Sequence, residues 1–184
     1  MAAVSNMYNK NFILVLCFCL SGLLINNYAH ANSSDSVKII SPIKYETWRD
    51  HLTTYKPNVV VVDMWAMWCS SCLERFPEMV SLHEKYRNHN VSFISMNLDD
   101  RTDTDSLQAA EKFISSMNAQ FEHFRMDENL MEAFNKIGLL SIPAVLIYNQ
   151  EGKEQYRLSG DNPNNQFTEH DIEIAINSLL GNNK

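Results

Sequence analysis

The feature that most constrains this chain is a pair of cysteines placed directly after an apolar segment. Residues 59–65 are nearly all apolar, which is typical of a strand that is covered on both faces of a sheet. Cys69 and Cys72 follow, and a helical pattern begins there. At a helix start, unpaired backbone N–H groups and the helix dipole stabilise a thiolate. The sequence therefore predicts an α/β core with a reactive dithiol beside its central strand.

The first 31 residues have the three-part layout of a secretory signal peptide. Lys10 is the only charged residue before an apolar block at 12–25, and Ala29-His30-Ala31 places small residues where a signal peptidase cuts. The block is short for a membrane-spanning helix, which needs about 20 residues. We therefore expect a signal peptide at 1–31, one folded domain at 32–184 and export to the periplasm. An uncleaved N-terminal membrane anchor is the alternative.

Cleavage after residue 31 would remove two of the four cysteines, Cys17 and Cys19, and leave only Cys69 and Cys72. A pair three residues apart is a poor staple, because closing so short a loop takes little entropy from the unfolded chain. Zinc would need two further ligands near the pair, and haem attachment would need histidine where Leu73 stands. The pattern favours redox chemistry, and we expect no metal and no cofactor.

The composition restricts the classes of molecule that the protein can bind. The formal net charge is −7 and no run is rich in lysine or arginine, which argues against binding to nucleic acid. A length of 184 residues with 45% hydrophobic content fits one globular domain. We expect a monomer.

The periodicity along residues 32–184 predicts alternating strands and helices. The predicted strands lie at residues 37–40, 59–65, 91–98, 121–126, 144–148 and 154–158. The predicted helices lie at 45–55, 69–87, 107–118, 128–137 and 168–180, and the polar residues 99–106 predict a loop. Parallel pairing first and a hairpin last predict a mixed central sheet with helices on both faces and an inserted helix–strand unit near the middle.

This order, with Trp-Cys-x-x-Cys after the central strand, resembles the thioredoxin-like family and its exported TlpA/ResA-like branch of thiol:disulfide oxidoreductases. Residues 65–72 match the WAxWCxxC signature of that branch, and Pro77 matches its helix-kinking proline. Asp63 matches its buried acid under the dithiol, and Ile142-Pro143 matches its cis-proline loop. The resemblance covers nearly all of 32–184 and implies a thioredoxin fold.

One position departs from the branch. Members often carry a glutamate three residues after the second cysteine, and Arg75 stands there, with Glu74 one residue earlier. A role of that glutamate in tuning the dithiol is therefore not transferred to Glu74.

The resemblance implies roles for the matching residues. Cys69 would be the nucleophile, and Cys72 would resolve the mixed disulfide. Asp63 would accept the Cys72 proton, and a carboxylate turned to solvent at the strand end is its alternative. Substrate contacts would come from the aromatic side chain before Cys69 and from the proline loop, that is from Trp68, Ile142 and Pro143.

The function implied is reduction of disulfides in envelope proteins, with protein thiols and disulfides as substrates and a membrane thiol-transfer protein as electron source. An oxidase or isomerase of the same fold is one alternative. A non-catalytic copper-binding module is another, because Met64 and Met67 lie near the two thiols, although methionine in a strand is usually packing. Histidines such as His83 and His89 show no metal spacing, and we expect them in solvent.

Overall fold

The computed structural model describes residues 39–161, 164 and 166–181. They belong to the second of two compact units, Val37–Lys184. The first unit, Met1–Ser36, lies outside the described residues, and so does the predicted signal peptide. Among the helices of the described ranges, none has the length and apolar character needed to cross a bilayer.

The described residues form a six-stranded mixed sheet of order β1-β4-β3-β2-β5-β6. Its strands are β1 (Ser41–Ile43), β2 (Val59–Trp65), β3 (Val91–Asn97), β4 (Glu122–Met126), β5 (Ala144–Tyr148) and β6 (Glu154–Ser159). The helices are α1 (Tyr45–His51), its 3-10 continuation η1 (Leu52–Tyr55), α2 (Ser70–Tyr86), α3 (Thr104–Met117), α4 (Leu130–Ile137) and α5 (Glu169–Leu179). The first four strands pair in parallel, while β5 is antiparallel to both β2 and β6. The predicted hairpin and mixed sheet are confirmed.

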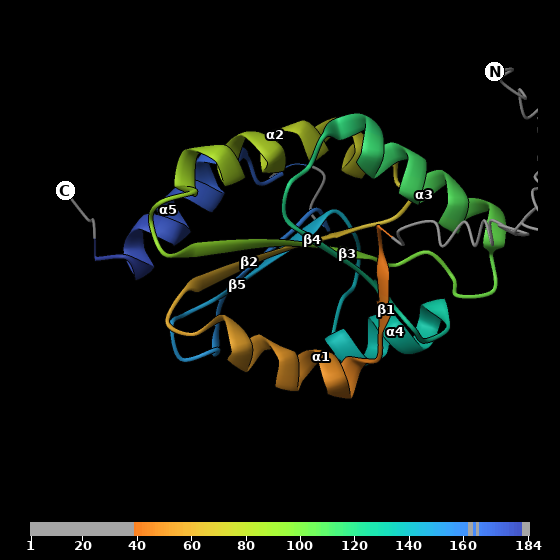
Figure 1. Cartoon of the computed structure of the whole chain (residues 1–184), viewed down its shortest axis with the longest axis horizontal. Helices are drawn as coiled ribbons and strands as arrows, with labels where there is room; N and C mark the ends of the chain where they lie inside the picture. The colour runs from red at the N-terminus through yellow and green to blue at the C-terminus, as the bar shows by residue number, and fades with distance from the viewer. Residues whose placement is uncertain (1–38, 162–163, 165, 182–184) are drawn as a thin grey trace, which may run out of the picture. The chain divides into compact units, whose positions relative to one another are not determined.

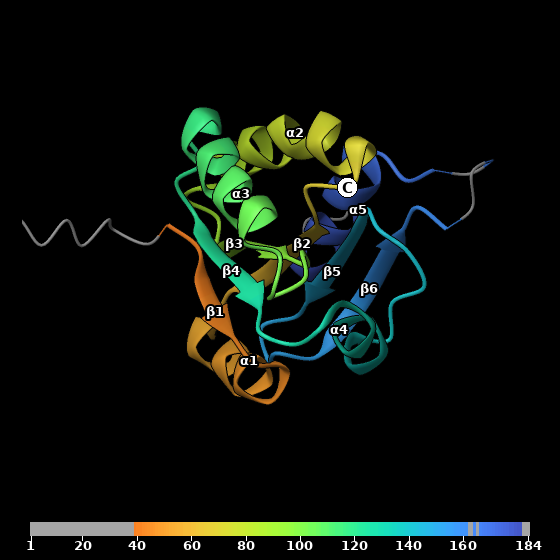
Figure 2. The same ribbon diagram turned by 90° about the vertical axis from the view of Figure 1, so that its right-hand side faces the viewer.

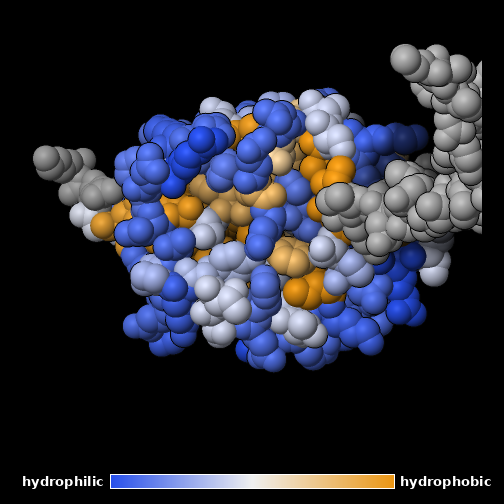
Figure 3. Space-filling view, viewed as in Figure 1, coloured by the Kyte–Doolittle hydropathy of each residue, from blue (hydrophilic) through white to orange (hydrophobic). Residues whose placement is uncertain are grey.

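Helices cover both faces of the sheet, as Figures 1 and 2 show: α2, α3 and α5 lie on one face, and α1 and α4 on the other. In the space-filling view of Figure 3, hydrophilic side chains cover much of the outer helical surface. Apolar colours gather at the level of the sheet between the two helical layers. The predicted α/β architecture, a mixed central sheet between two layers of helices, is confirmed.

Every residue of β2 is buried, and its side chains alternate between two cores. Val60, Val62 and Met64 pack with residues of α1 and α4. Val59 and Val61 pack with α2 and α5 on the other face. Because the side-chain period of a strand is two, Asp63 projects to the same face as Val61, under α2. The strand that precedes the cysteines is thus fixed by packing on both sides.

Two elements, the first strand and α3, depart from their predicted bounds by three or more residues. The first strand is β1 at Ser41–Ile43 rather than 37–40, because its position is set by parallel pairing with Phe124–Met126. The predicted loop at 99–106 is too long, since α3 begins at Thr104. Asp103 caps that helix by accepting hydrogen bonds from the Ser106 backbone N–H at 3.0 Å and from its hydroxyl at 2.8 Å.

The core under α2 gives a direct test of the packing. Leu82 is fully buried, whereas Leu140 is 87% exposed. Leu82→Ala should lower the free energy of unfolding by about 2–5 kcal/mol through lost burial and the cavity left behind. Leu140→Ala, the control, should change it by no more than about 0.5 kcal/mol. Urea unfolding measures both, and equal effects would contradict the assignment of this core.

Candidate functional site

The two cysteines lie at the start of α2 and form a disulfide, with a Cα–Cα distance of 5.3 Å. Cys69 is the N-cap residue, and its sulfur accepts a hydrogen bond from the Cys72 backbone N–H at 3.3 Å. The Ser71 hydroxyl lies 3.6 Å from the same sulfur. Cys69 is 7% exposed and Cys72 1% exposed. Cys69 is therefore the more accessible cysteine, and its sulfur lies at the N-terminal end of the helix, where the Cys72 N–H and the helix dipole favour negative charge.

A buried acid that the sequence reasoning missed holds the loop before the cysteines. Both carboxylate oxygens of Asp99 accept from the backbone N–H of Met67, at 3.0 and 3.1 Å. Asn97 donates to the same carboxylate at 2.7 Å. Burial raises the pKa of Asp99, while the Asn97 and Met67 hydrogen bonds oppose the rise. The signal in the sequence is an Asn-x-Asp pair that spans the end of the predicted strand 91–98 and the start of the predicted loop 99–106.

Asp63 is 1% exposed on β2, so the alternative of a solvent-facing carboxylate is wrong. Neither of its oxygens has a hydrogen-bond partner among the described residues. Burial raises its pKa from the ordinary 3.8 to about 6, the Arg75 charge opposes the rise and Glu78 adds to it. A carboxyl group with a pKa near neutrality, on the face under α2, can exchange protons with a thiol.

Arg75, the residue that departs from the related branch, lies one helical turn after Cys72 on α2. Its guanidinium stacks on the Phe167 ring at 4.1 Å. Its Nη1 atom is buried and has no hydrogen-bond partner in the described part of the chain. The positive charge of Arg75 favours the ionised form of Asp63 and so lowers its pKa. At this position of the helix the chain therefore has a positive side chain, where members of the related branch often have a glutamate.

The predicted proline loop reaches the cysteine region. The Ile142–Pro143 peptide bond is cis. Ile142 is half-buried and packs against the cluster that contains both cysteines, while Pro143 is buried. Gly160, which the sequence reasoning passed over, donates to the Pro143 carbonyl at 2.9 Å. A Cβ there would meet Pro143 atoms at 3.2 and 3.3 Å, so only glycine fits without displacing the loop.

The aromatic residues of the motif divide between surface and core. Trp68 is 55% exposed, with its ring 6.5 Å from that of Phe134 on α4, so it presents an aromatic surface next to Cys69. Trp65 is fully buried and packs edge-on to Phe76 at 5.4 Å. Of the predicted site residues, the cluster around the dithiol thus gathers Cys69, Cys72 and Ile142.

The methionines near the motif and His83 were also considered as possible metal ligands or solvent-exposed side chains. Met64 is buried in the core on the opposite face of the sheet, whereas Met67 packs against the cysteine cluster. The prediction that His83 lies in solvent is wrong: its ring packs edge-on to Phe93 and Phe121, at 5.9 and 5.3 Å. No group of three or more His, Cys, Asp or Glu residues that could hold a metal occurs within the described ranges.

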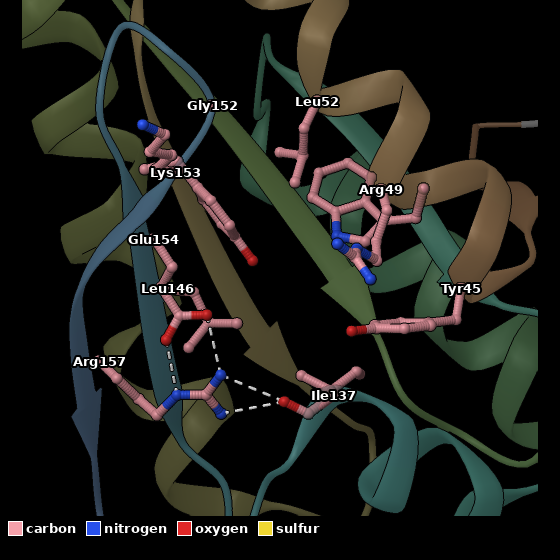
Figure 4. Close-up of a pocket in the computed structure, with 11 residues that line it drawn as sticks. Tyr45, Arg49, Leu52, Ile137, Leu146, Gly152, Lys153, Glu154 and Arg157 are labelled. Atoms are coloured by element: carbon pink, nitrogen blue, oxygen red, sulfur yellow. Dashed lines mark hydrogen bonds and ion pairs between the residues drawn. The ribbon is translucent and has the colours of Figure 1, made fainter.

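A cavity of about 390 Å³ lies on the other face of the sheet, between α1, β5 and β6. Figure 4 shows the Arg157 guanidinium at one end, paired with Glu154 and bonded to the Ile137 carbonyl, and Tyr45 and Arg49 at the opposite wall. None of the predicted site residues is among those that line it. The cavity is therefore separate from the dithiol site.

Comparison with known proteins agrees with this geometry. Residues 56–154 match the family described as thioredoxin-like. The chain belongs to the thioredoxin-like family. It is 22% identical over 162 residues to the thiol-disulfide oxidoreductase ResA of Bacillus thuringiensis, covering 86% of this chain and 90% of that one.

Solved structures share the fold. A Chlorobium tepidum protein named as a thiol:disulfide interchange protein DsbE is 26% identical, with a TM-score of 0.56 over 71% of this chain and 85% of its own. A secreted disulfide oxidoreductase of Mycobacterium tuberculosis is 18% identical, with a TM-score of 0.53 over 68% of this chain and 85% of its own. In this thioredoxin-like chain the cysteine pair stands at the expected helix start.

The burial of Asp63 predicts a pH dependence of stability. The folded protein holds the Asp63 proton more tightly than the unfolded chain, since its pKa rises from 3.8 to about 6. Wild-type stability should therefore fall by about 3 kcal/mol as the pH rises through that window, and stay lower above it. Asp63→Asn removes this dependence, so its free energy of unfolding should gain about 3 kcal/mol on wild type between about pH 4 and pH 7.

Urea unfolding of the oxidised protein across this range measures the difference. Asp50→Asn, at an exposed position of α1, is the matched control and should follow the wild-type curve. Parallel curves for wild type and Asp63→Asn would contradict a raised pKa at Asp63.

Proposed function

We propose that this protein is an exported reductase of disulfides in envelope proteins, with Cys69 as nucleophile, Cys72 as resolving thiol and Asp63 as proton acceptor. The protein is a thiol–disulfide oxidoreductase of the thioredoxin fold. One observation carries the proposal. The cysteine pair caps α2 with the Cys69 sulfur hydrogen-bonded to the Cys72 N–H, while a buried carboxyl without a hydrogen-bond partner in the described part of the chain lies on the strand face under the same helix.

The reaction begins with the reduced dithiol. The Cys69 thiolate attacks one sulfur of a substrate disulfide, forms a mixed disulfide and releases the other substrate sulfur as a thiolate. The Cys72 thiolate then attacks the Cys69 sulfur, which closes the Cys69–Cys72 disulfide and releases the second substrate thiolate. Two electrons pass from the dithiol to the substrate. The disulfide in the structure corresponds to the oxidised product of this cycle.

The difference in exposure between Cys69 and Cys72 supports their assignment as nucleophile and resolving thiol. Cys69 is more exposed than Cys72, so an entering substrate sulfur meets Cys69 first. Cys72 must lose its proton inside the protein before it can attack, which requires a nearby base. Asp63 meets this need, because burial brings its pKa to about 6. When Asp63 accepts the proton, it becomes neutral, the form that its apolar surroundings favour.

A substrate would dock beside the cysteines on two surfaces. Trp68 offers an exposed ring next to Cys69, and such rings are frequent contact residues. The backbone of the Ile142-Pro143 loop offers polar groups to an extended substrate segment, as in strand addition. We propose protein thiols and disulfides as substrates, with the protein acting as a monomer.

Export is supported by the layout of residues 1–31, which we propose is a signal peptide that precedes a thioredoxin-like domain at 32–184. In an oxidising compartment a reductase needs a supply of electrons, and a membrane thiol-transfer protein could supply them. Dithiols of this fold span about −270 to −120 mV. The reductive role predicts an equilibrium potential against glutathione near the lower value, and a potential near the upper one would make the protein an oxidase.

Reduction of insulin disulfides tests the roles of the two thiols. Cys69→Ala should abolish turnover, because no nucleophile remains to attack the substrate. Cys72→Ala should instead accumulate a mixed disulfide with the substrate, visible as a band that a reductant removes, because no thiol is left to resolve it.

Ser70→Ala is the matched control, since Ser70 lies exposed between the two cysteines and should leave turnover near the wild-type rate. Turnover by Cys69→Ala at the wild-type rate would refute the proposed function.

A further inference from the structure

A row of three buried polar residues crosses the sheet beside the cysteines. Asp63 on β2 is opposite Ser95 on β3, and Ser95 is opposite His123 on β4. Neighbouring strands lie about 4.8 Å apart, and residues paired in this way project to the same face. The three are 1%, 0% and 7% exposed. Polar side chains are rare at such depth without a partner or a task.

The hydrogen bonds of His123 give the row a direction. The Ser95 hydroxyl oxygen lies 2.8 Å from His123 Nδ1, and the Ala119 carbonyl oxygen lies 3.4 Å from Nε2. A carbonyl only accepts, so the neutral ring carries its proton on Nε2, and Nδ1 accepts from the Ser95 hydroxyl. The lone pairs of the Ser95 oxygen are then free to accept a proton from the β2 side, where Asp63 lies.

Asp63 is the open end of this row, because neither of its oxygens is hydrogen-bonded within the described residues. Ser95 is its direct cross-strand neighbour on β3, on the same face of the sheet. We propose that the Asp63–Ser95–His123 row carries the proton that Asp63 takes from Cys72 across the sheet to His123. This inference rests on the acid–base role of Asp63 in the proposed function.

The transfer conserves protons and moves no electrons. Protonated Asp63 gives its proton to the Ser95 oxygen while the Ser95 hydroxyl proton moves to His123 Nδ1. Asp63 returns to the carboxylate, and the imidazole becomes an imidazolium. The imidazolium then releases a proton to water. Before the next turnover the ring regains the tautomer with its proton on Nε2, and the Ser95 hydroxyl rotates back toward Nδ1. Ser95 and His123 thus act through Asp63 and are positioning residues rather than catalytic ones.

The far end of the row lies close to the sheet margin. Edge strand β1 pairs only with Phe124–Met126 among the described residues of β4, so His123 lies beyond the end of this pairing. Figure 2 shows β1 running alongside β4 at that side of the sheet. His123 keeps 7% of its surface exposed, whereas Ser95 has none. The histidine is therefore the member of the row that can reach solvent.

Electrostatics favour a proton moving between the two ends. Burial raises the pKa of Asp63 to about 6 and lowers the pKa of His123 from 6.5, so the two shifts bring the carboxyl and the imidazole toward each other in proton affinity. Other titratable or charged groups face the ends of the row. They are Arg75 and Glu78 of α2 near Asp63, Glu122 next to His123, and His83 of α2, which contacts Phe121 against the His123 ring.

Titration of the His123 ring by NMR tests the coupling in the folded, oxidised protein. In wild type, the ring nitrogen shifts of His123 should show a step at the pH where Asp63 titrates, and Asp63→Asn should remove that step. Ser95→Ala should remove it as well, because the hydroxyl link is gone. Ser92→Ala is the matched control on β3, since Ser92 bonds to Asn58 and projects to the other face, and it should keep the step.

Single-turnover resolution of a mixed disulfide tests the function. Asp63→Asn should slow resolution most, while Ser95→Ala and His123→Gln should slow it at least about threefold and shift its pH profile. Ser92→Ala should resolve at the wild-type rate. The wild-type titration of His123 does not depend on any variant folding.

The results distinguish the acid–base role of Asp63 from the proton relay through Ser95 and His123. Normal resolution in Asp63→Asn would refute the acid–base role, and the relay with it. Slow resolution in Asp63→Asn together with a wild-type rate and pH profile in Ser95→Ala would refute the relay alone. A His123 titration that is unchanged by Asp63→Asn would also refute the relay.

Discussion

The arrangement of the site depends on one costly feature, a carboxyl group buried in the apolar centre of the sheet without a hydrogen-bond partner among the described residues. A charged carboxylate in such surroundings is strongly disfavoured, so the group is pushed toward its neutral form and its pKa rises to about 6. Asp63 is held there because every other residue of β2 is buried and packed on one of two cores. The fold thus accepts a loss of stability at a position that can move a proton.

The other parts of the site are arranged around that strand. The Asp99 carboxylate binds the Met67 backbone and so fixes the loop that carries the chain from β2 to Cys69. The start of α2 then presents the Cys69 sulfur to N–H groups. Arg75, held on Phe167, lies on the same helix and moderates the rise in the Asp63 pKa. Asp99, the start of α2 and Arg75 thus each place a charge or a dipole near the dithiol or near Asp63.

The sequence predicted best where burial is continuous. Strands β2 and β5 have the predicted limits, because unbroken apolar runs are the signature of strands covered on both faces. The α/β element order was likewise predictable from local periodicity, and the thioredoxin fold from the resemblance carried by the cysteine motif, Asp63, Pro77 and Ile142-Pro143. The first strand was misplaced because its three residues are defined by pairing with Phe124–Met126, a contact between distant segments that no local pattern encodes.

Side-chain contacts between distant segments were also out of reach. Asp99 lies in a loop as predicted, but its burial and its bond to Met67 were not foreseen, because Met67 is 32 residues away in the sequence. His83 was expected in solvent, but Phe93 and Phe121 cover it. The row from Asp63 to His123 becomes visible only once strand order and register bring three separate segments together.

The measurement that tests the central claim most directly is the titration of the Asp63 carboxyl carbon by ¹³C NMR, assigned by its absence in Asp63→Asn. We expect one aspartate carboxyl in the folded protein to titrate near a pKa of about 6, well above the ordinary 3.8. A protein in which every aspartate carboxyl titrates in the ordinary range would contradict this expectation, because an Asp63 carboxylate with an ordinary pKa would be too weak a base to take the proton of Cys72.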